Sequence, residues 1–229
     1  MATIQQRFET AIRQLTEPFN GQFPRPWMTD LTDPLTASLF IVGMNQATGY
    51  PTDKLTHERH MNALFNRAGE SCRRLYDEMR GSAASPTRVN IERLSRALNQ
   101  EGVDRILETN VVCYSTAMSG DLRLVEHAGG REHGTETFRV LLEFVRPKVL
   151  IVHGRGAGQA LESCLHAPIP VPPSGPSGLV STDIDGMRVF VVPSLAPPKW
   201  NQWCGWADAY LAKVAKAAAE VLYQTAQAP

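Results

Sequence analysis

The sequence lacks the features that would place it in a membrane or a secretory pathway. Its 229 residues contain no apolar run approaching the roughly 18 residues that a membrane-spanning helix needs. The N-terminal stretch MATIQQRFET has neither the basic start nor the apolar segment of a secretory signal. We therefore expect a single globular domain over residues 1–229 that is cytoplasmic, monomeric and without a membrane partner.

The chain also lacks an excess of either charge. Its 23 Lys and Arg residues match its 23 Asp and Glu residues, so the formal net charge is zero. A protein that coats nucleic acid by bulk electrostatics needs a large basic excess to displace counterions, and this class is excluded. A net charge of zero is still compatible with a local basic groove.

Paired cysteines are missing as well. The four cysteines lie far apart, with no CxxC pair of the kind that structural zinc and many iron–sulfur sites use. We expect reduced, mostly buried thiols and no cofactor; a long-range four-cysteine cluster is the alternative. The four are Cys72, Cys113, Cys164 and Cys204.

The histidines do not form a recognisable metal motif. His57 and His60 lie three residues apart in HERH, whereas a zinc-binding helix of the HExxH type needs a separation of four. We expect a solvated helix face there, and solvated positions for His127 and His133 in the loop after the second strand. No metal site is predicted.

Short apolar runs alternate with helical patterns along the chain. Buried strands are expected at 37–42, closing at Gly43, and at 106–114, 149–152 and 187–192; the last is preceded by an arm at 179–182 and an Asp185-Gly186 hairpin turn. Helical patterns cover 4–15, 86–98, 138–145, 154–165 and 210–222. This order predicts an α/β fold with an open, mostly parallel sheet and helices on both faces.

Ligands of such sheets bind beyond the carboxyl ends of the strands. The segments to inspect are therefore 43–51, 110–120, 153–158 and 193–203. In the first of them, Asn45 is a neutral donor and acceptor that could orient a water or a carbonyl. The alternative is a loop asparagine that satisfies its own turn.

Two later strand ends offer further polar groups. The turn 154–158 exposes backbone amides beside Arg155, which suits a phosphate, although the glycine spacing is not that of a dinucleotide site and a tight turn explains it equally. The proline-stiffened loop with Lys199, Trp200 and Asn201 could grip a base by stacking. The alternative is that Trp200, Trp203 and Trp206 anchor this loop to the core.

Taken together, the four strand ends resemble the uracil-DNA glycosylase superfamily. IVGMNQATGY resembles its first motif, nearest the GxNP form, and ETNVV resembles the second-strand segment that leads to the base pocket. RPKVLIVHGRGAG resembles the third strand with its glycine turn, and VFVVPSLAPPKWN occupies the place of the final motif. The resemblance covers roughly residues 37–205.

The resemblance implies a three-layer α/β/α sandwich with a central four-stranded, mostly parallel sheet. It also implies a DNA repair enzyme that binds DNA with an extruded base and hydrolyses the N-glycosidic bond of uracil or a related damaged base. Asn45 would position the water, and Asn110 would read the base edge. The backbone of residues 47–50, from Ala47 to Tyr50, and the Tyr50 side chain would shape the pocket. The rest of the implied site comprises Gly43, Met44 and Gln46 around the base, Ser194 or Asn201 as donor to the leaving base, Trp200 for stacking, and Arg155 and Lys199 on the flanking phosphates.

Two departures from the family pattern define the alternatives. Gln46 stands where the GxNP motif has proline, and the final motif lacks its usual histidine. Loss of one preorganised donor costs about 10²–10³ in rate in a well-studied oxyanion hole, which implies a weak enzyme. The alternatives are a non-catalytic nucleic-acid-binding or nucleotide-binding protein of the same fold, and a different α/β enzyme acting on a small nucleotide at the turn 154–158.

Overall fold

The computed structural model describes residues 2–81 and 83–226, and the chain divides into two compact units. Unit 1 comprises Met1–Ala37, Gly43–Ser82 and Leu107–Arg146. Unit 2 comprises Ser38–Val42, Ala83–Ile106 and Pro147–Pro229. The expectation of one domain over residues 1–229 stays a prediction.

The strands form a five-stranded sheet in the order β2-β1-β3-β5-β4, which confirms the α/β class and the α/β/α architecture. Strand β3 pairs in parallel with β1 and with β5, while β4 runs antiparallel to β5. The strands are β1 (Leu39–Gln46), β2 (Ile106–Ser115), β3 (Val149–His153), β4 (Ser181–Ile184) and β5 (Met187–Val192).

The fifth strand is the first arm of the hairpin that Asp185-Gly186 predicts. Both turn residues have positive φ, 49° at Asp185 and 77° at Gly186, as the favoured two-residue hairpin turn requires. The turn places Thr182 opposite Val189. The sheet therefore has one strand more than the four that the family resemblance implied.

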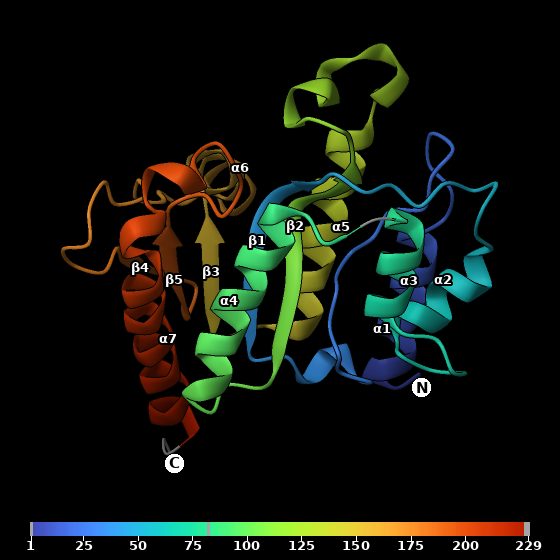
Figure 1. Cartoon of the computed structure of the whole chain (residues 1–229). Helices are drawn as coiled ribbons and strands as arrows, with labels where there is room; N and C mark the ends of the chain where they lie inside the picture. The colour runs from blue at the N-terminus through green and yellow to red at the C-terminus, as the bar shows by residue number, and fades with distance from the viewer. Residues whose placement is uncertain (1, 82, 227–229) are drawn as a thin grey trace. The chain divides into compact units, whose positions relative to one another are not determined.

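Unit 2 is a layered piece of this sheet with helices on both faces. Alternate strand residues, Leu39, Ile41, Val149, Ile151, Phe190 and Val192, form one apolar cluster with residues of α4 and α7. These two helices contact each other and lie side by side in front of β3 and β5 in Figure 1, whereas α6 contacts β3 from behind. The intervening residues Leu150 and Val152 are buried too, as expected for parallel strands covered on both faces. The helices are α4 (Pro86–Gln100), α6 (Arg155–Leu165) and α7 (Cys204–Ala226).

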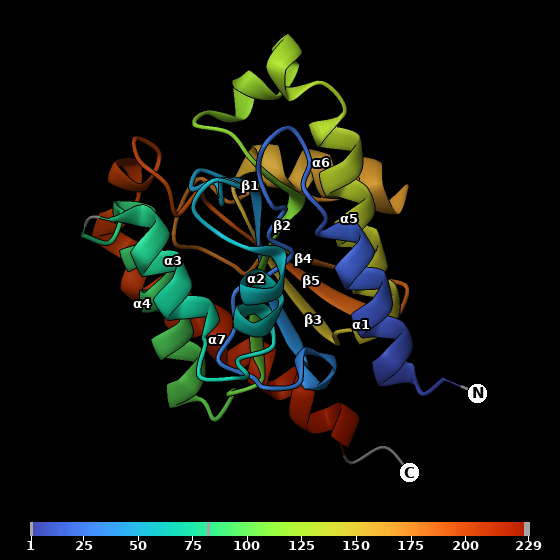
Figure 2. The ribbon, with the colours of Figure 1, turned by 90° about the vertical axis from the view of Figure 1, so that its right-hand side faces the viewer.

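Unit 1 is organised around its N-terminal helix. Helix α1 begins with a capping box between Thr3 and Gln6, and it buries Phe8 and Ile12. Phe8 packs on Phe144 at 5.4 Å between ring centroids, and Figure 2 shows α1 running along α5. The helices of the unit are α1 (Ile4–Leu15), α2 (His57–Leu64), α3 (Cys72–Arg80) and α5 (Gly130–Val145).

Strand β1 runs three residues beyond Gly43, where the sequence predicted its end. The backbone N–H of Thr116 donates to the Gln46 carbonyl at 3.0 Å, so pairing continues past the glycine. Asn45 is consequently a strand residue rather than a loop residue. Its side chain is half-buried, whereas that of its neighbour Gln46 is buried.

Candidate functional site

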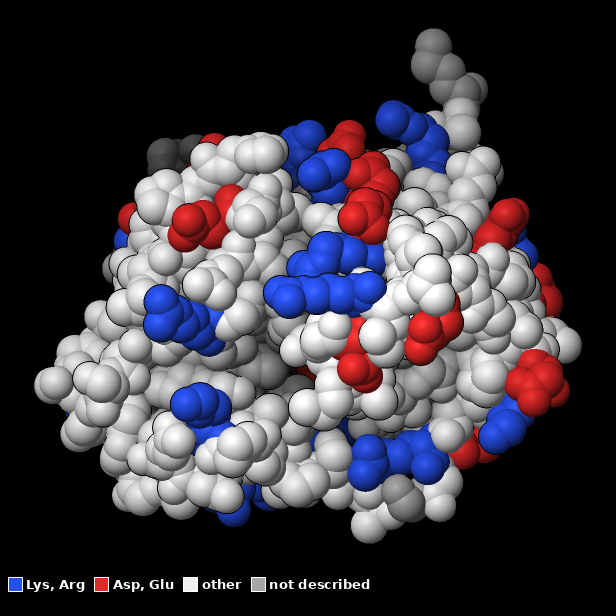
Figure 3. Space-filling view, turned by 90° about the horizontal axis from the view of Figure 1, so that it is seen from above, with Lys and Arg blue, Asp and Glu red and all other residues white. Residues whose placement is uncertain are grey.

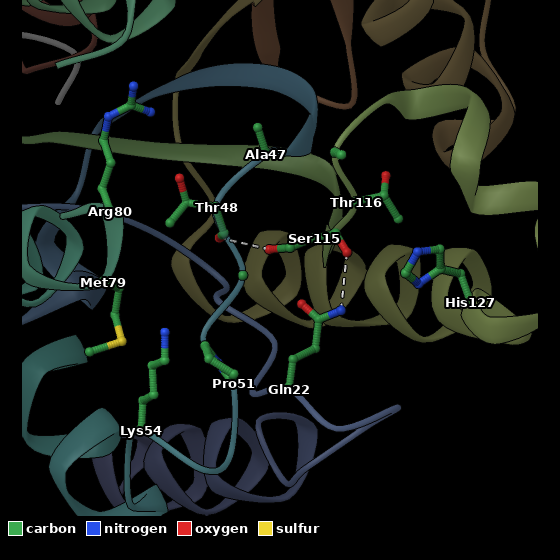
Figure 4. A pocket seen from close by; sticks show the side chains of 12 residues that line it. Gln22, Ala47, Thr48, Pro51, Lys54, Met79, Arg80, Ser115, Thr116 and His127 are labelled. Carbon is green, nitrogen blue, oxygen red and sulfur yellow. Dashed lines mark hydrogen bonds between the residues drawn. The ribbon is translucent and has the colours of Figure 1, made fainter. Parts of the chain in front are cut away.

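A cavity of about 550 Å³ lies in unit 1, at the carboxyl ends of β1 and β2 (Figure 4). Its walls come from the segments that follow these strands, 47–54 and 115–117, and from Gln22, His127 and the end of α3. Two of the four segments that the sequence singled out, 43–51 and 110–120, therefore contribute to one cavity. Of the backbone 47–50 that was predicted to shape the pocket, Ala47, Thr48 and Gly49 are among its lining residues.

Hydrogen bonds around Ser115 fix the floor of the cavity. The Ser115 hydroxyl lies 2.9 Å from the Thr48 carbonyl and 3.2 Å from Gln46 Oε1, so its single proton is shared between two acceptors. Gln22 Nε2 donates to the Ser115 carbonyl at 3.0 Å, as Figure 4 shows. The loop after β1 is thereby tied to the end of β2.

The Asn45 amide has a defined orientation beside this cavity. Its Nδ2 donates to Thr116 Oγ1 at 2.8 Å and to the Gln46 carbonyl at 3.2 Å. The Thr116 hydroxyl donates its own proton to the Met118 carbonyl at 2.7 Å, so it accepts from Asn45. Since a carbonyl only accepts, the nitrogen must face Gln46 O, and Oδ1 points away from both partners. Asn45 is not a lining residue, but its partner Thr116 is.

The other residues of the first motif support the walls. Gln46 is buried, and its Nε2 donates to the Arg25 carbonyl. Met44 packs against Val112, Tyr114 and Leu122. Gly43 is a buried residue of β1. Substrate contacts by Gly43, Met44 and Gln46 stay predictions.

Tyr50 is buried in a cluster with Phe23 and Leu55. Its hydroxyl has no hydrogen-bond partner within the described part of the chain, and burial raises the pKa of Tyr50 above its usual range. The Arg25 guanidinium lies 5.5 Å from the centre of its ring. Tyr50 therefore stands behind the lining residues Gly49 and Pro51 rather than in the cavity itself.

Asn110 lies in the middle of β2, five residues before the strand ends at Ser115. Its side chain is half-buried and does not line the cavity. The residues at this strand end that do line it are Ser115, Thr116 and Ala117. Base reading by Asn110 stays a prediction.

The remaining predicted residues belong to unit 2. The Ala196 N–H donates to Ser194 Oγ at 3.2 Å, and Trp203 Nε1 donates to the Ser194 carbonyl at 2.9 Å. Trp203 is buried, so it anchors this loop as the alternative interpretation expected, and Trp200 is half-buried with the Arg93 guanidinium 5.8 Å from its ring centre. Of the predicted site residues in unit 2, Lys199 and Asn201 of the loop and Arg155 at the start of α6 are exposed.

The backbone geometry of the turn before α6 requires a glycine at position 154. Gly154 has a φ of 89°, and a Cβ atom there would lie 3.2 Å from Ser194 Cβ. Its N–H donates to the Val192 carbonyl at 2.9 Å. A tight strand-to-helix turn therefore accounts for this glycine.

Asn45 belongs to unit 1 and Ser194 to unit 2. Their predicted convergence on one extruded base stays a prediction. The same holds for the phosphate contacts assigned to Arg155 and Lys199.

The expected solvated histidines are partly wrong. His60 is fully buried, and burial lowers its pKa to about 3. His127 lines the cavity, with Nδ1 3.0 Å from the Tyr114 hydroxyl, and His133 lies in α5 with Nε2 2.8 Å from the Leu15 carbonyl. Among residues 2–81 and 83–226, no group of His, Cys, Asp or Glu is arranged to hold a metal ion. Three of the four cysteines are buried, as predicted.

Sequence reasoning missed part of the cavity. Ser115 and Thr116 fall within an inspected segment but were passed over, while Gln22, Lys54 and Arg80 carry no motif at all. The residues of the cavity meet only because distant segments fold together. The distribution of charge does not indicate the position of the cavity either. The face in Figure 3, toward which β3 and β5 run, exposes both basic and acidic side chains.

Comparison with known proteins adds no family assignment. No protein-family model matches the chain, and no curated protein matches it significantly. Within the described residues, no helix combines the length and the apolar character needed to cross a membrane.

Proposed function

We propose that the chain is a uracil-DNA glycosylase-like hydrolase that cleaves the N-glycosidic bond of uracil or a related base in DNA. The observation that carries the proposal is the oriented Asn45 amide beside a cavity at the ends of β1 and β2. The strand-end order in the sequence resembles the same superfamily. DNA repair is the process in which such an activity takes part.

In this proposal the extruded nucleoside enters the cavity and Asn45 Oδ1 accepts a hydrogen bond from the attacking water. A neutral amide is a poor base, so its contribution is to hold the water in line with the anomeric carbon. Positive charge develops on the sugar and negative charge on the leaving base. No carboxylate lines the cavity among the described residues, which suits a leaving group that becomes anionic.

A fluorescent oligonucleotide with one uracil, offered single-stranded and double-stranded, tests the proposal. We expect abasic product from the wild type and a rate about 10²-fold lower for Asn45→Ala, because the water loses its position. Asn99→Ala, which removes an exposed amide from α4, is the matched control and should retain the wild-type rate. Absence of product at high enzyme concentration would count against the proposal.

Thr116 offers a second test, because it acts through Asn45. Thr116→Val removes the acceptor of Asn45 Nδ2 while keeping the shape of the side chain. We expect the cleavage rate to fall about tenfold, as a lost hydrogen bond of about 1 kcal/mol or slightly more implies. Thr116→Ser, which keeps the hydroxyl, should restore most of the rate, and an equal loss in both variants would contradict the role of the hydroxyl.

The second candidate is a non-catalytic nucleic-acid-binding or nucleotide-binding protein of the same fold. It is favoured by the missing final-motif histidine and by Ser194 Oγ, which accepts a hydrogen bond from Ala196 of its own loop. This candidate predicts salt-sensitive binding of the oligonucleotide with no abasic product. If Arg155→Ala combined with Lys199→Ala leaves that binding unchanged, the phosphate contacts assigned to these residues are wrong.

A further inference from the structure

The cavity of unit 1 has two chemically different walls. Figure 4 shows Lys54, Met79 and Arg80 on one side and Thr116 and His127 on the other. The first wall carries two cations, and the second offers a hydroxyl and an imidazole as hydrogen-bonding groups. A ligand that fits both walls has an anionic part and an uncharged polar part.

Lys54 is exposed and is not held by an ion pair within the described chain, unlike several arginines of unit 1. Five arginines of this unit form ion pairs with Glu side chains: Arg13, Arg59, Arg67, Arg74 and Arg139. The ammonium group of Lys54 has no ion pair or hydrogen bond with any described residue, and it is exposed. Its charge therefore remains available to a ligand.

The position of the cations also matters. Arg80 is the last residue of α3, and a basic residue there is favourable to the helix dipole, so Arg80 alone would carry no argument. Lys54 follows a turn at Pro51 and does not lie at the C-terminal end of a helix, so the helix dipole does not explain its position. Met79, between them in sequence and space, packs against the buried cluster of Phe23 and Tyr50 and so fixes the end of α3 at the cavity.

We infer that Lys54 and Arg80 form a phosphate-binding wall, which holds a backbone phosphate of the DNA strand whose nucleoside enters the cavity. The inference rests on the proposed function and deepens it, because it assigns a phosphate contact to unit 1 that the family resemblance placed at Arg155 and Lys199. Two cations without a lining carboxylate match a phosphodiester in charge. The opposite wall, with Thr116 and His127, faces the sugar and base.

Binding as a function of salt tests this assignment directly. The probe is a fluorescent single-stranded oligonucleotide with one 2′-fluoro-2′-deoxyuridine, whose fluorine opposes positive charge on the sugar and so prevents cleavage. Anisotropy titrations at several KCl concentrations compare the wild type with Lys54→Gln, Arg80→Gln and the double variant. Lys216→Gln, at an exposed position of α7, is the matched control, and circular dichroism checks that each variant is folded.

Each lost phosphate contact should make the slope of log Kobs against log salt less negative by about 0.7, and weaken binding about fivefold at 0.1 M salt. The double variant should lose about 25-fold, and the Lys216 control nothing. An unchanged slope in the double variant, or no binding of the oligonucleotide by the wild type, overturns the inference.

A mononucleotide arm identifies the group that is bound. We expect 2′-deoxyuridine 5′-monophosphate to bind more tightly than 2′-deoxyuridine, with the difference reduced in Lys54→Gln and lost in the double variant. Equal affinities of the two for the wild type contradict a phosphate site in the cavity. Cleavage is measured separately on an unmodified uracil strand. If the salt dependence of binding is weaker in the variants but no abasic product forms, the phosphate-binding wall is supported and the glycosylase activity is contradicted. If abasic product forms but the salt dependence is the same in all variants, the glycosylase activity is supported and the phosphate-binding wall is contradicted.

Discussion

The two units differ in what they bury. Unit 2 packs an apolar face of β1, β3 and β5 against α4 and α7. Unit 1 also encloses polar atoms that have no partner in the described chain, namely Gln22 Oε1, Arg25 Nε, Tyr50 Oη and both ring nitrogens of His60. Unit 2 has fewer such atoms among the described residues, and His153 Nδ1 is one of them. Each such group costs about 1–3 kcal/mol of desolvation. Within the described residues, unit 1 therefore buries more of these costly polar groups than unit 2, and Gln22 and Tyr50 lie at or directly behind its cavity.

The largest expected effect is in unit 2. Ile151→Ala removes a fully buried side chain from the middle of β3, and we expect it to lower the free energy of unfolding by about 2–5 kcal/mol. Ile151→Val should cost only about 0.5–1.5 kcal/mol. Urea unfolding at neutral pH measures both. If Ile151→Ala costs less than Ile151→Val, the apolar packing assigned to unit 2 is wrong.

The next effect concerns the buried histidine of unit 1. Because burial lowers the pKa of His60 to about 3, the unfolded state binds a proton between about pH 6.5 and 3 that the native state does not. Stability is therefore lost as the pH falls below 6.5 and is unaffected by His60 above it. His60→Phe keeps an aromatic ring against Tyr50 and Phe23 but cannot titrate.

Between neutral pH and pH 5, the wild type should lose about 2 kcal/mol more of its free energy of unfolding than His60→Phe does. Urea unfolding of both proteins at several pH values gives this difference. The comparison cancels the contribution of His153, which both proteins keep. A difference that does not change with pH would show that His60 is not buried in its neutral form.

The smallest effect is the removal of an unpartnered hydroxyl. Tyr50→Phe should leave the free energy of unfolding unchanged or raise it by up to about 1 kcal/mol, because the hydroxyl has no partner. Tyr114→Phe is the contrasting change in the same unit. The Tyr114 hydroxyl lies 3.2 Å from Asn20 Nδ2 and 3.0 Å from His127 Nδ1, so its loss should cost about 1 kcal/mol. Thermal and urea unfolding of the pair would refute the comparison if the order were reversed.

The fold could be predicted where the pattern is local. The apolar run 149–152 and the spacing of Phe8 and Ile12 predict their elements correctly, because burial on two faces or on one stripe is visible within a few residues. The end of β1 was misplaced since the hydrogen bond from Thr116 N to Gln46 O joins segments 70 residues apart. Gly43 gives no sign of this pairing.

The site was less predictable than the fold. Asn45 could be found from its position after an apolar run, and Thr116 lies in an inspected segment. Lys54 and Arg80 have no distinguishing neighbours in the sequence, because only the folded chain brings them to one cavity. The burial of His60 was missed for a related reason: its cover of Phe23 and Tyr50 comes from other segments.

The most direct measurement is the single-turnover rate of uracil release from a single-stranded oligonucleotide, for the wild type, Asn45→Ala and Asn99→Ala. We predict measurable release by the wild type and by Asn99→Ala, and a rate about 10²-fold lower for Asn45→Ala. Equal rates for the wild type and Asn45→Ala, or no release by any of the three, would contradict this prediction.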